Sequence, residues 1–416
     1  MIRSRLRSSP RSSRSPRSKT RSENKSIKKK FYIKTFSEKN KVNCNKYSNC
    51  PKHLDLIPKK IRNNELKLIF VGCWGVYCKD GINMLYKPPK NKDKSKDKVK
   101  DKDKSKDKSK DKVKDKVKDK SKDKDNYTEV VYGGKTASDL MIEYSKRYNI
   151  DAVVLAGDNV YSDPYYYEKY EKKFTKFDKN QLYLINKQLK EGYINCYKNI
   201  ITDMFLIGIG NHDIETCDIL NKQFNFVDDK WKLPALSYVQ KFILDDETKI
   251  NMIFIDTNMY DEDASFCDNQ LYSEDDRVKQ NKWLKSILRK EKDSWNIVVG
   301  HIPFVYNIRK KDSDKNGNAM LKYMLKEHED YIDLYMCADE HNQQYILDPE
   351  IDIPEVISGT GGAILDDKFI GEETEGTLLK RAGFGFVGMS IDTDAIKLEF
   401  VLKNHEIITY YVPRKR

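Results

Sequence analysis

Between residues 151 and 161 the chain reads DAVVLAGDNVY. Five apolar residues in succession, two of them valine, indicate a strand that is buried on both faces, as in the interior of a parallel sheet. The apolar run ends at Gly157, and Asp158 follows it directly. Open α/β sheets bind their ligands at the carboxyl ends of their strands, so Asp158 is a candidate site residue. Tyr161, three residues further on, is close enough to reach the same point.

The same arrangement recurs at three other places in the chain. Apolar runs at 204–209, 295–299 and 332–337 lead into the segments Gly210-Asn211-His212-Asp213, Gly300-His301-Ile302-Pro303 and Ala338-Asp339-Glu340-His341-Asn342. Each run therefore delivers Asp, Asn or His at the end of a short strand. Carboxylate, amide and imidazole groups together are the ligands that suit a pair of hard or borderline cations. We expect these four strand ends to converge on a metal site at one edge of the fold.

The net charge of +13 is concentrated in two low-complexity segments. Residues 1–30 hold twelve basic residues and one glutamate, and residues 90–125 hold 18 lysines and ten aspartates, which leaves a charge of −6 on the rest of the chain. The 38% hydrophobic and 11% aromatic content of the 416 residues is enough for a substantial core. The basic character thus belongs to the two segments, and the predicted fold is mildly acidic.

We expect residues 1–63 to form a disordered, basic, Arg/Ser-rich tail with a lead-in to the fold, because residues 1–30 show no apolar periodicity. Such a tail can bind nucleic acid or another polyanion by counterion release, can be phosphorylated or serve as a nuclear signal, or can simply solubilise the chain. Lysine occupies every even position from 90 to 124, so residues 88–126 are predicted to be a solvated Lys/Asp insert. This insert interrupts a single domain at 64–413.

No apolar segment follows the basic amino-terminal residues, as a secretory signal peptide requires, and no run approaches the roughly 20 apolar residues of a membrane span. We therefore expect an intracellular protein without a membrane partner, in the cytoplasm or nucleus, or in a virion if the source is viral. The eight cysteines, which are irregularly spaced, are then expected to be reduced. Cys44, Cys50 and His53 are a weak indication of zinc.

The remaining patterns predict an ordinary α/β alternation. Apolar runs and alternations predict strands at 66–72, 236–244, 251–256, 385–392, 396–402 and 406–412, and helices at 137–148 and 274–289. In the second helix, Val278, Trp283, Leu284 and Ile287 are predicted to be the buried side. Residues 358–362 form a glycine-rich turn, which lacks the following lysine of a phosphate-binding loop and is predicted to be a strand connection.

The strand-end motifs carry a family resemblance. The motifs are Gly157-Asp158-x-x-Tyr161, Gly210-Asn211-His212-Asp213, Gly300-His301-x-Pro303 and His341-Asn342-x-Gln344. In this order they resemble the calcineurin-like metallophosphoesterases, and among these the mammalian-type (tartrate-resistant) purple acid phosphatases. The resemblance covers about residues 64–413 without the Lys/Asp insert. It implies an α/β fold, namely a four-layer α/β/β/α sandwich of two mixed sheets.

The resemblance also implies two divalent or trivalent metal ions, iron paired with iron, zinc or manganese. Asp158 would bridge the two ions; Tyr161 and His341 would complete one site, and Asn211 and His301 would belong to the other. His212, oriented by Asp213, would face the substrate phosphate and stabilise the transition state or protonate the leaving group. Two such cations can clamp a phosphate and lower the pKa of a water molecule between them.

Two positions depart from the family pattern. The family has Asp where this chain has Cys73, and the first His of Gly-His-x-His where this chain has Asp339. A thiolate at Cys73 would keep the charge of the Asp but is softer, which favours zinc or ferrous iron. A carboxylate at Asp339 would add one negative charge, weaken the metals as Lewis acids and repel a phosphate dianion. If neither residue is a ligand, the centre holds one metal ion or none.

Two hypotheses of function therefore stand. The first is a hydrolase, a metal-dependent phosphoesterase that acts like an acid phosphatase on phosphomonoesters through a metal-activated water. The second is a catalytically impaired protein of the phosphatase fold, which acts through its basic tail as a structural or polyanion-binding component. Hydrolysis of an aryl phosphate that is lost on Asp158→Asn would favour the first. Salt-sensitive binding of nucleic acid that is lost on deletion of residues 1–30 would favour the second.

Overall fold

The computed structural model describes residues 41–75, 84–86, 128–130, 133–161, 185–261, 266–267, 270–307, 317–365, 369 and 372–415. The chain divides into two units, Met1–Lys41 and Val42–Arg416, and every element discussed below belongs to the second. The predicted Arg/Ser-rich segment at 1–30 and the Lys/Asp insert at 88–126 lie outside the described residues.

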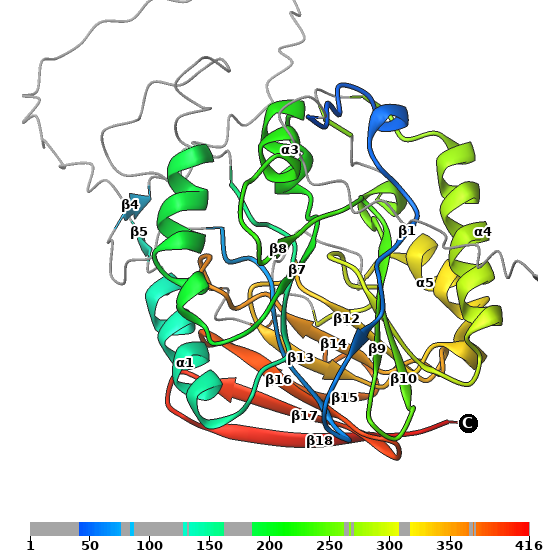
Figure 1. Ribbon diagram of the computed structural model, residues 1–416. Helices are drawn as coiled ribbons and strands as arrows, with labels where there is room; N and C mark the ends of the chain where they lie inside the picture. Colours follow the sequence, from blue (N-terminus) through cyan, green and yellow to red (C-terminus); the bar gives the residue numbers. More distant parts are fainter. Residues whose placement is uncertain are drawn as a thin grey trace, which may run out of the picture. The chain divides into compact units, whose positions relative to one another are not determined.

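Two mixed sheets form the centre of the second unit (Figure 1). One contains β1 (Leu54–Asp55), β2 (Lys59–Lys60), β9 (Tyr238–Ile243), β10 (Lys249–Phe254), β11 (Trp295–Val299), β12 (Leu334–Cys337), β13 (Gln343–Ile346), β14 (Glu355–Ser358) and β15 (Thr377–Arg381). The other contains β3 (Leu66–Val71), β6 (Ala152–Ala156), β7 (Phe205–Gly208), β8 (Trp231–Lys232), β16 (Gly385–Ile391), β17 (Ala395–Leu402) and β18 (Ile407–Pro413). Strands β4 (Met84–Tyr86) and β5 (Thr128–Val130) form a separate hairpin-like pair.

Parallel pairing brings the site-bearing strands together. In the seven-stranded sheet β3, β6 and β7 are parallel neighbours. In the nine-stranded sheet β10, β11, β12 and β14 are parallel neighbours in that order. Because parallel neighbours end at the same edge of a sheet, the segments that follow β3, β6 and β7 lie together, as do those that follow β11 and β12.

The strands are buried on both faces because two cores flank each sheet. In β3, Leu68 and Phe70 belong to the core that also holds Phe254 of β10, in the other sheet, whereas Ile69 and Val71 belong to the core beneath the helices. This two-residue alternation between two apolar environments explains why the strand reads as a continuous apolar run. The arrangement confirms the predicted four-layer sandwich, and Figure 1 shows α1 and α4 on opposite sides of the strands.

The α-helices with defined bounds are α1 (Gly134–Arg147), α3 (Cys217–Phe224), α4 (Glu274–Lys290) and α5 (Ala319–Lys326). The start of α4 is fixed by a capping box between Ser273 and Asp276. The predicted buried side of α4 needs correction, since Val278 is 37% exposed and Gln280 is buried. Gln280 accepts a hydrogen bond from Ser237 and donates one to the carbonyl of Asp256, so its burial leaves these polar atoms satisfied. None of the described helices has the length and apolar character needed to cross a membrane.

The compact unit begins at Val42, earlier than the boundary at 64 expected from the sequence. Strands β1 and β2 both pair in parallel with β9. Nearby, Leu236 N donates to the Pro51 carbonyl at 2.9 Å, which anchors the same segment. Strands β1 and β2 therefore belong to the nine-stranded sheet, and the residues before them are part of the same unit. These two-residue strands are too short to leave a periodic pattern in the sequence.

The prediction of reduced cysteines is wrong for five of them. Disulfides join Cys44 to Cys50 and Cys217 to Cys267, and Cys196 is also disulfide-bonded. The zinc indication at Cys44, Cys50 and His53 is therefore corrected: the two cysteines are joined to each other. The fold brings Cys217, at the start of α3, to a residue 50 positions away, a pairing that no local spacing reveals.

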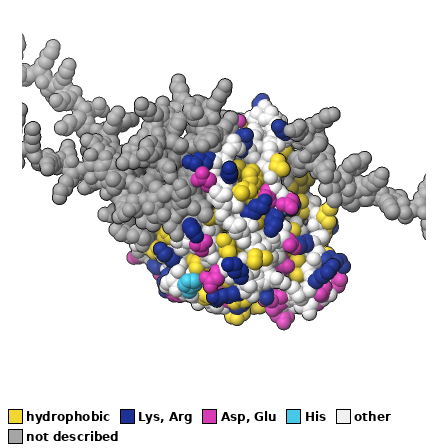
Figure 2. Space-filling view, turned by 60° about the vertical axis from the view of Figure 1, so that its left-hand side comes forward, with side chains coloured by type: hydrophobic (Ala, Val, Ile, Leu, Met, Phe, Trp, Pro, Cys, Tyr) yellow, Lys and Arg dark blue, Asp and Glu magenta, His cyan; other side chains and the backbone are white. Residues whose placement is uncertain are grey.

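The described surface carries both signs of charge. Figure 2 shows one face on which Lys and Arg side chains are interspersed with Asp and Glu side chains. Interspersed charges of this kind create no extended field of one sign. The described residues of this face therefore offer no single-sign patch for a polyanion.

Candidate metal centre

The ends of the two sheets meet at His301, which follows β11. Its Nδ1 lies 2.7 Å from the carbonyl oxygen of Ala156, the last residue of β6 in the other sheet. A carbonyl only accepts hydrogen bonds, so Nδ1 carries the proton and donates it. Nε2 therefore lies on the other side of the ring, where a histidine with this support presents its lone pair when it binds a metal.

Three oxygen atoms surround Nε2 of His301. Oδ1 of Asn211 lies at 3.1 Å, Oδ1 of Asp158 at 3.2 Å and Oδ1 of Asp339 at 3.4 Å. Cys73 completes this group, because the ligand atoms of Cys73, Asp158 and His301 all lie within 4.8 Å of one another. Five strand ends from both sheets thus supply five donor side chains around His301.

Tyr161 and His341 form a second pair of donors. The Tyr161 hydroxyl lies 3.4 Å from Nε2 of His341, and Nδ1 of His341 donates to the Ile364 carbonyl at 2.7 Å. The backbone of Tyr161 is held on both sides by the Gln188 amide, at 2.9 and 2.7 Å. A backbone carbonyl thus orients the ring of His341, as another orients that of His301. All seven predicted metal ligands lie in these two groups.

The backbone is strained where three of these residues leave their strands. Cys73, Asp158 and Asp339 have φ angles of 54°, 53° and 58°, in the left-handed region. For a residue with a side chain this conformation costs on the order of 1–3 kcal/mol and occurs preferentially at functional sites. Cys73 N donates to the Gly157 carbonyl at 3.1 Å, and Gly75 N donates to the Asp158 carbonyl at 2.9 Å, so the two strand ends fix each other.

His212 lies beside both groups, but Asp213 does not orient it as predicted. Nδ1 of His212 lies 2.5 Å from Oε1 of Glu215. The backbone N–H of His212 donates to Asp158 Oδ1 at 3.2 Å, and the centre of its ring lies 4.6 Å from that of Tyr161. The His212 side chain is 25% exposed, so a ligand from solution can reach it. Glu215 is a site residue that the sequence analysis missed.

Asp213 acts instead as a brace between two strand ends. Its carboxylate accepts hydrogen bonds from the backbone N–H groups of Asn159, Val160 and Gly210 at 2.8–3.0 Å. It also accepts one from the amide of Gln223 at 2.9 Å. Burial, and then the neighbouring Asp158 charge, raise the pKa of Asp213 to about 7. The residue therefore positions the segments that carry Asp158 and Asn211 rather than the His212 ring.

Opposite charges shift the pKa values at the centre. Burial raises the pKa of Asp158, but the imidazoles of His301, His212 and His341 outweigh burial and bring this pKa well below its usual range. Burial lowers the pKa of His212, but the carboxylates of Asp158 and Glu215 outweigh it and raise the pKa to about 9. Asp158 and His301 are each 1% exposed. Buried ionisable groups of this kind are normally paired or coordinate a metal.

The donor set fits metal ions. Carboxylate and amide oxygens, imidazole nitrogen, a phenol and a thiol all belong to the ligand types used for zinc, iron and manganese. Two histidines have their ring orientation fixed by backbone carbonyls, which is the outer support that metal sites require. Bound ions would be held by Cys73, Asp158, Asn211, His301 and Asp339 on one side and by Tyr161 and His341 on the other.

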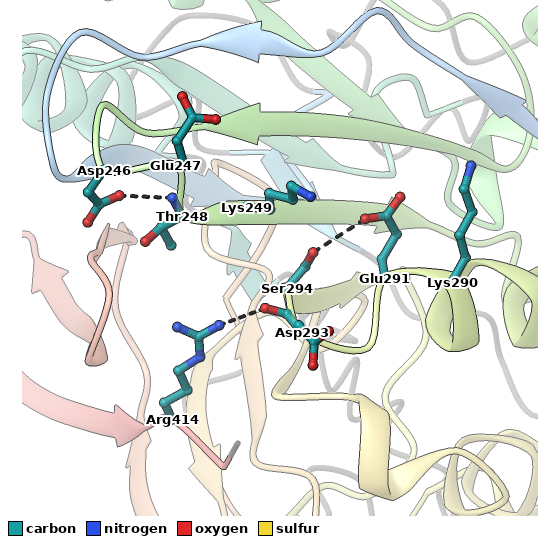
Figure 3. A pocket seen from close by; sticks show the side chains of 9 residues that line it. All are labelled: Asp246, Glu247, Thr248, Lys249, Lys290, Glu291, Asp293, Ser294 and Arg414. Atoms are coloured by element: carbon teal, nitrogen blue, oxygen red, sulfur yellow. Dashed lines mark hydrogen bonds between the residues drawn. The ribbon is translucent and has the colours of Figure 1, made fainter.

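A polar cavity of about 360 Å³ lies elsewhere on the unit (Figure 3). It is found where β10 and β11 begin, whereas His301 follows the end of β11. Its lining consists of Asp246, Glu247, Thr248, Lys249, Lys290, Glu291, Asp293, Ser294 and Arg414. Figure 3 shows Arg414 turned towards Asp293, whose carbonyl accepts its hydrogen bond at 2.7 Å. The cavity holds no histidine or cysteine and is separate from the metal centre.

Comparisons with known proteins match the part of the chain that contains the two donor groups. The family model for the calcineurin-like phosphoesterases matches residues 66–343, more than half of the chain, and this range contains every residue of the two donor groups. Purple acid phosphatase 17 of Arabidopsis thaliana is 26% identical over 232 residues, covering 53% of this chain and 61% of that protein. The chain thus spans less than two thirds of this curated relative.

One solved structure with a TM-score above 0.5 shares the fold at low identity. GAP50, described as the anchor in the inner membrane complex of Plasmodium, matches with a TM-score of 0.51 and 18% identity, over 85% of this chain and 90% of that one. Purple acid phosphatase PPD1 of yellow lupin matches with a TM-score of 0.49 and 14% identity, over 85% of this chain and 54% of that one. The predicted resemblance is confirmed: the chain belongs to the calcineurin-like phosphoesterase family and is similar to the purple acid phosphatases.

Proposed function

We propose that this protein is a metal-dependent phosphoesterase that hydrolyses phosphomonoesters. The observation that carries the proposal is the pair of donor groups, five side chains around His301 and the Tyr161–His341 pair, with the partly exposed His212 beside them. Metal ions bound there would supply Lewis-acid chemistry and a water of lowered pKa. The family match supports the proposal, since the matched residues 66–343 contain both donor groups.

The residues of the chain have separate tasks in this proposal. Asp158 holds negative charge between the two donor groups. His212, with Glu215 on Nδ1, presents Nε2 to the phosphate and can donate a proton to a phosphate oxygen or to the leaving group. Asp339 adds a carboxylate beside Nε2 of His301 and repels a phosphate dianion, so we expect slower turnover than with a neutral ligand in its place.

The test is hydrolysis of p-nitrophenyl phosphate by protein depleted of metal and then reconstituted with zinc, iron or manganese. We expect metal-dependent hydrolysis that His301→Ala abolishes. His328→Ala is the matched control: His328 is also buried, and its Nε2 lies 2.7 Å from Asn281, outside the two donor groups. Hydrolysis that survives His301→Ala, or that needs no metal, would refute the proposal.

Glu215→Gln tests the role of His212 separately. The variant keeps an acceptor for Nδ1 but removes the charge that favours a protonated ring, so we expect kcat to fall about 10- to 100-fold, part of the total that general acid catalysis supplies. KM should change little, because Glu215 has no place among the metal donors. Glu215→Asp should recover part of the loss, and Asp218→Asn, an exposed acid in the first turn of α3, should behave as wild type. An unchanged kcat in Glu215→Gln would show that His212 does not act as an acid.

A further inference from the structure

Two cysteines of the described chain lie outside disulfides, and their surroundings differ. Cys73 and Cys337 are both buried. The Cys337 thiol donates to Glu355 Oε1 and to the Val356 carbonyl, both at 3.6 Å, so it is satisfied within its own sheet. The Cys73 sulfur instead lies within 4.8 Å of the ligand atoms of Asp158 and His301. Of these two cysteines, only Cys73 thus lies close to other side chains that can bind a metal.

The backbone around Cys73 directs its sulfur to that point. Its N–H donates to the Gly157 carbonyl at 3.1 Å, its own carbonyl accepts from Ala363 N at 3.0 Å, and its φ is 54°. Gly359 faces the sulfur, and a Cβ at Gly359 would lie 3.1 Å from it and 2.2 Å from the Glu340 carbonyl. Cys73 thus has a strained backbone that two main-chain hydrogen bonds hold, and a side chain at position 359 would collide with its surroundings. These contacts fix the direction of the Cys73 side chain.

We propose that Cys73 is a thiolate ligand of the metal centre and that the centre therefore selects a borderline cation, such as Zn(II), Co(II) or Fe(II), over Mg(II) or Mn(II). The inference rests on the metal binding of the proposed function, but it does not require turnover. Thiolate is a soft donor, and soft donors discriminate against hard cations that oxygen ligands accept. A metal-bound thiol is deprotonated, so Cys73 carries the same charge as the carboxylate that the family places there.

Charge balance favours a bound cation. Asp158, Asp339 and a Cys73 thiolate would contribute three negative charges, whereas His301 and Asn211 bind a metal as neutral donors. Three anionic groups, two of them buried, are unfavourable without a cation. The alternative is that Cys73 is an apolar filler, a role in which buried cysteines are common. The two readings differ in whether sulfur contacts the metal.

Spectroscopy with Co(II) separates these readings without an activity assay. We would remove metal from the full-length protein with a chelator, titrate Co(II), and record the near-ultraviolet charge-transfer absorption of thiolate bound to cobalt. Wild type and Cys337→Ser should show the band, and Cys73→Ser should lose it. Cys73→Asp should also lose it while still binding Co(II), because it restores the carboxylate of the family pattern. Zn(II) should displace the bound cobalt and so remove the band, whereas an equal concentration of Mg(II) should leave the band unchanged.

The outcomes are distinct. A band that persists in Cys73→Ser, bound cobalt without a band in wild type, or displacement by Mg(II) would each overturn the proposal. Retained cobalt in Cys73→Asp separates loss of the sulfur ligand from loss of the fold. A cobalt band in a protein that hydrolyses no phosphomonoester would refute the proposed function and leave the Cys73 inference standing. Metal-dependent hydrolysis by a protein whose bound cobalt gives no band would refute the Cys73 inference and leave the proposed function standing.

Discussion

Replacing Asp158 by Asn should remove metal from the protein and lower phosphomonoester hydrolysis by about 1,000-fold. The metal ions supply several kcal/mol to the reaction, and each 1.4 kcal/mol is about tenfold in rate. Asp158 is 1% exposed and lies 3.2 Å from Nε2 of His301. Its neutral replacement would leave the first donor group without its most buried carboxylate. Loss of outer supporting groups costs about 10- to 100-fold in metal affinity, and we expect a larger loss here.

Elemental analysis and p-nitrophenyl phosphate hydrolysis on the same preparation would measure both effects. Asp333→Asn is the matched control, because Asp333 is also 1% exposed and accepts a hydrogen bond from Asn296 N at 2.7 Å, at the opposite end of β11. Asp333→Asn should keep its metal even if it is less stable. An Asp158→Asn protein with wild-type metal content would contradict the assignment of Asp158.

Gly157→Ala should destabilise the protein and disturb the centre together. Gly157 has a φ of 92°, and a Cβ there would lie 2.5 Å from Gly210 N and 2.6 Å from Nδ1 of His301. Overpacking typically costs about 1–3 kcal/mol and a left-handed conformation a further 1–2 kcal/mol, so we expect the free energy of unfolding to fall by about 2–5 kcal/mol. Because the clash involves His301, the metal content should fall as well.

Chemical denaturation with and without bound metal would measure the stability change. Gly383→Ala provides the comparison, since a Cβ at Gly383 meets its nearest neighbour, the Leu402 side chain, at an ordinary 3.5 Å. That variant should lie within about 0.5 kcal/mol of wild type, as surface substitutions usually do. A Gly157→Ala protein with unchanged stability and metal content would mean that the strand end is less tightly fixed than the geometry indicates.

The buried strands could be predicted from the sequence because both of their faces are apolar. The runs at 66–72 and 295–299 correspond to β3 (Leu66–Val71) and β11 (Trp295–Val299). The two-residue strands β1, β2 and β8 are too short for any period to be visible. They are defined by pairing with distant strands, which a local pattern does not encode. The disulfide between Cys217 and Cys267 was missed for the same reason.

The candidate ligands could be predicted because each follows a strand, and strand ends meet at an edge. What holds the ligands in place could not be predicted. Asp213 follows His212 in the sequence, yet its carboxylate turns towards the backbone of Asn159, and the contact to the imidazole comes from Glu215, three residues along. Side-chain direction after a strand depends on local turns, such as the 3-10 turn at His212–Ile214, that spacing alone does not specify.

The central claim is that these two donor groups hold metal, and the number of metal ions per chain tests it most directly. The measurement is elemental analysis of full-length protein purified without chelators or metal-affinity tags. The account predicts close to two equivalents in wild type. One equivalent would contradict the assignment of two working donor groups. No metal in a protein with its fold intact would contradict the claim itself.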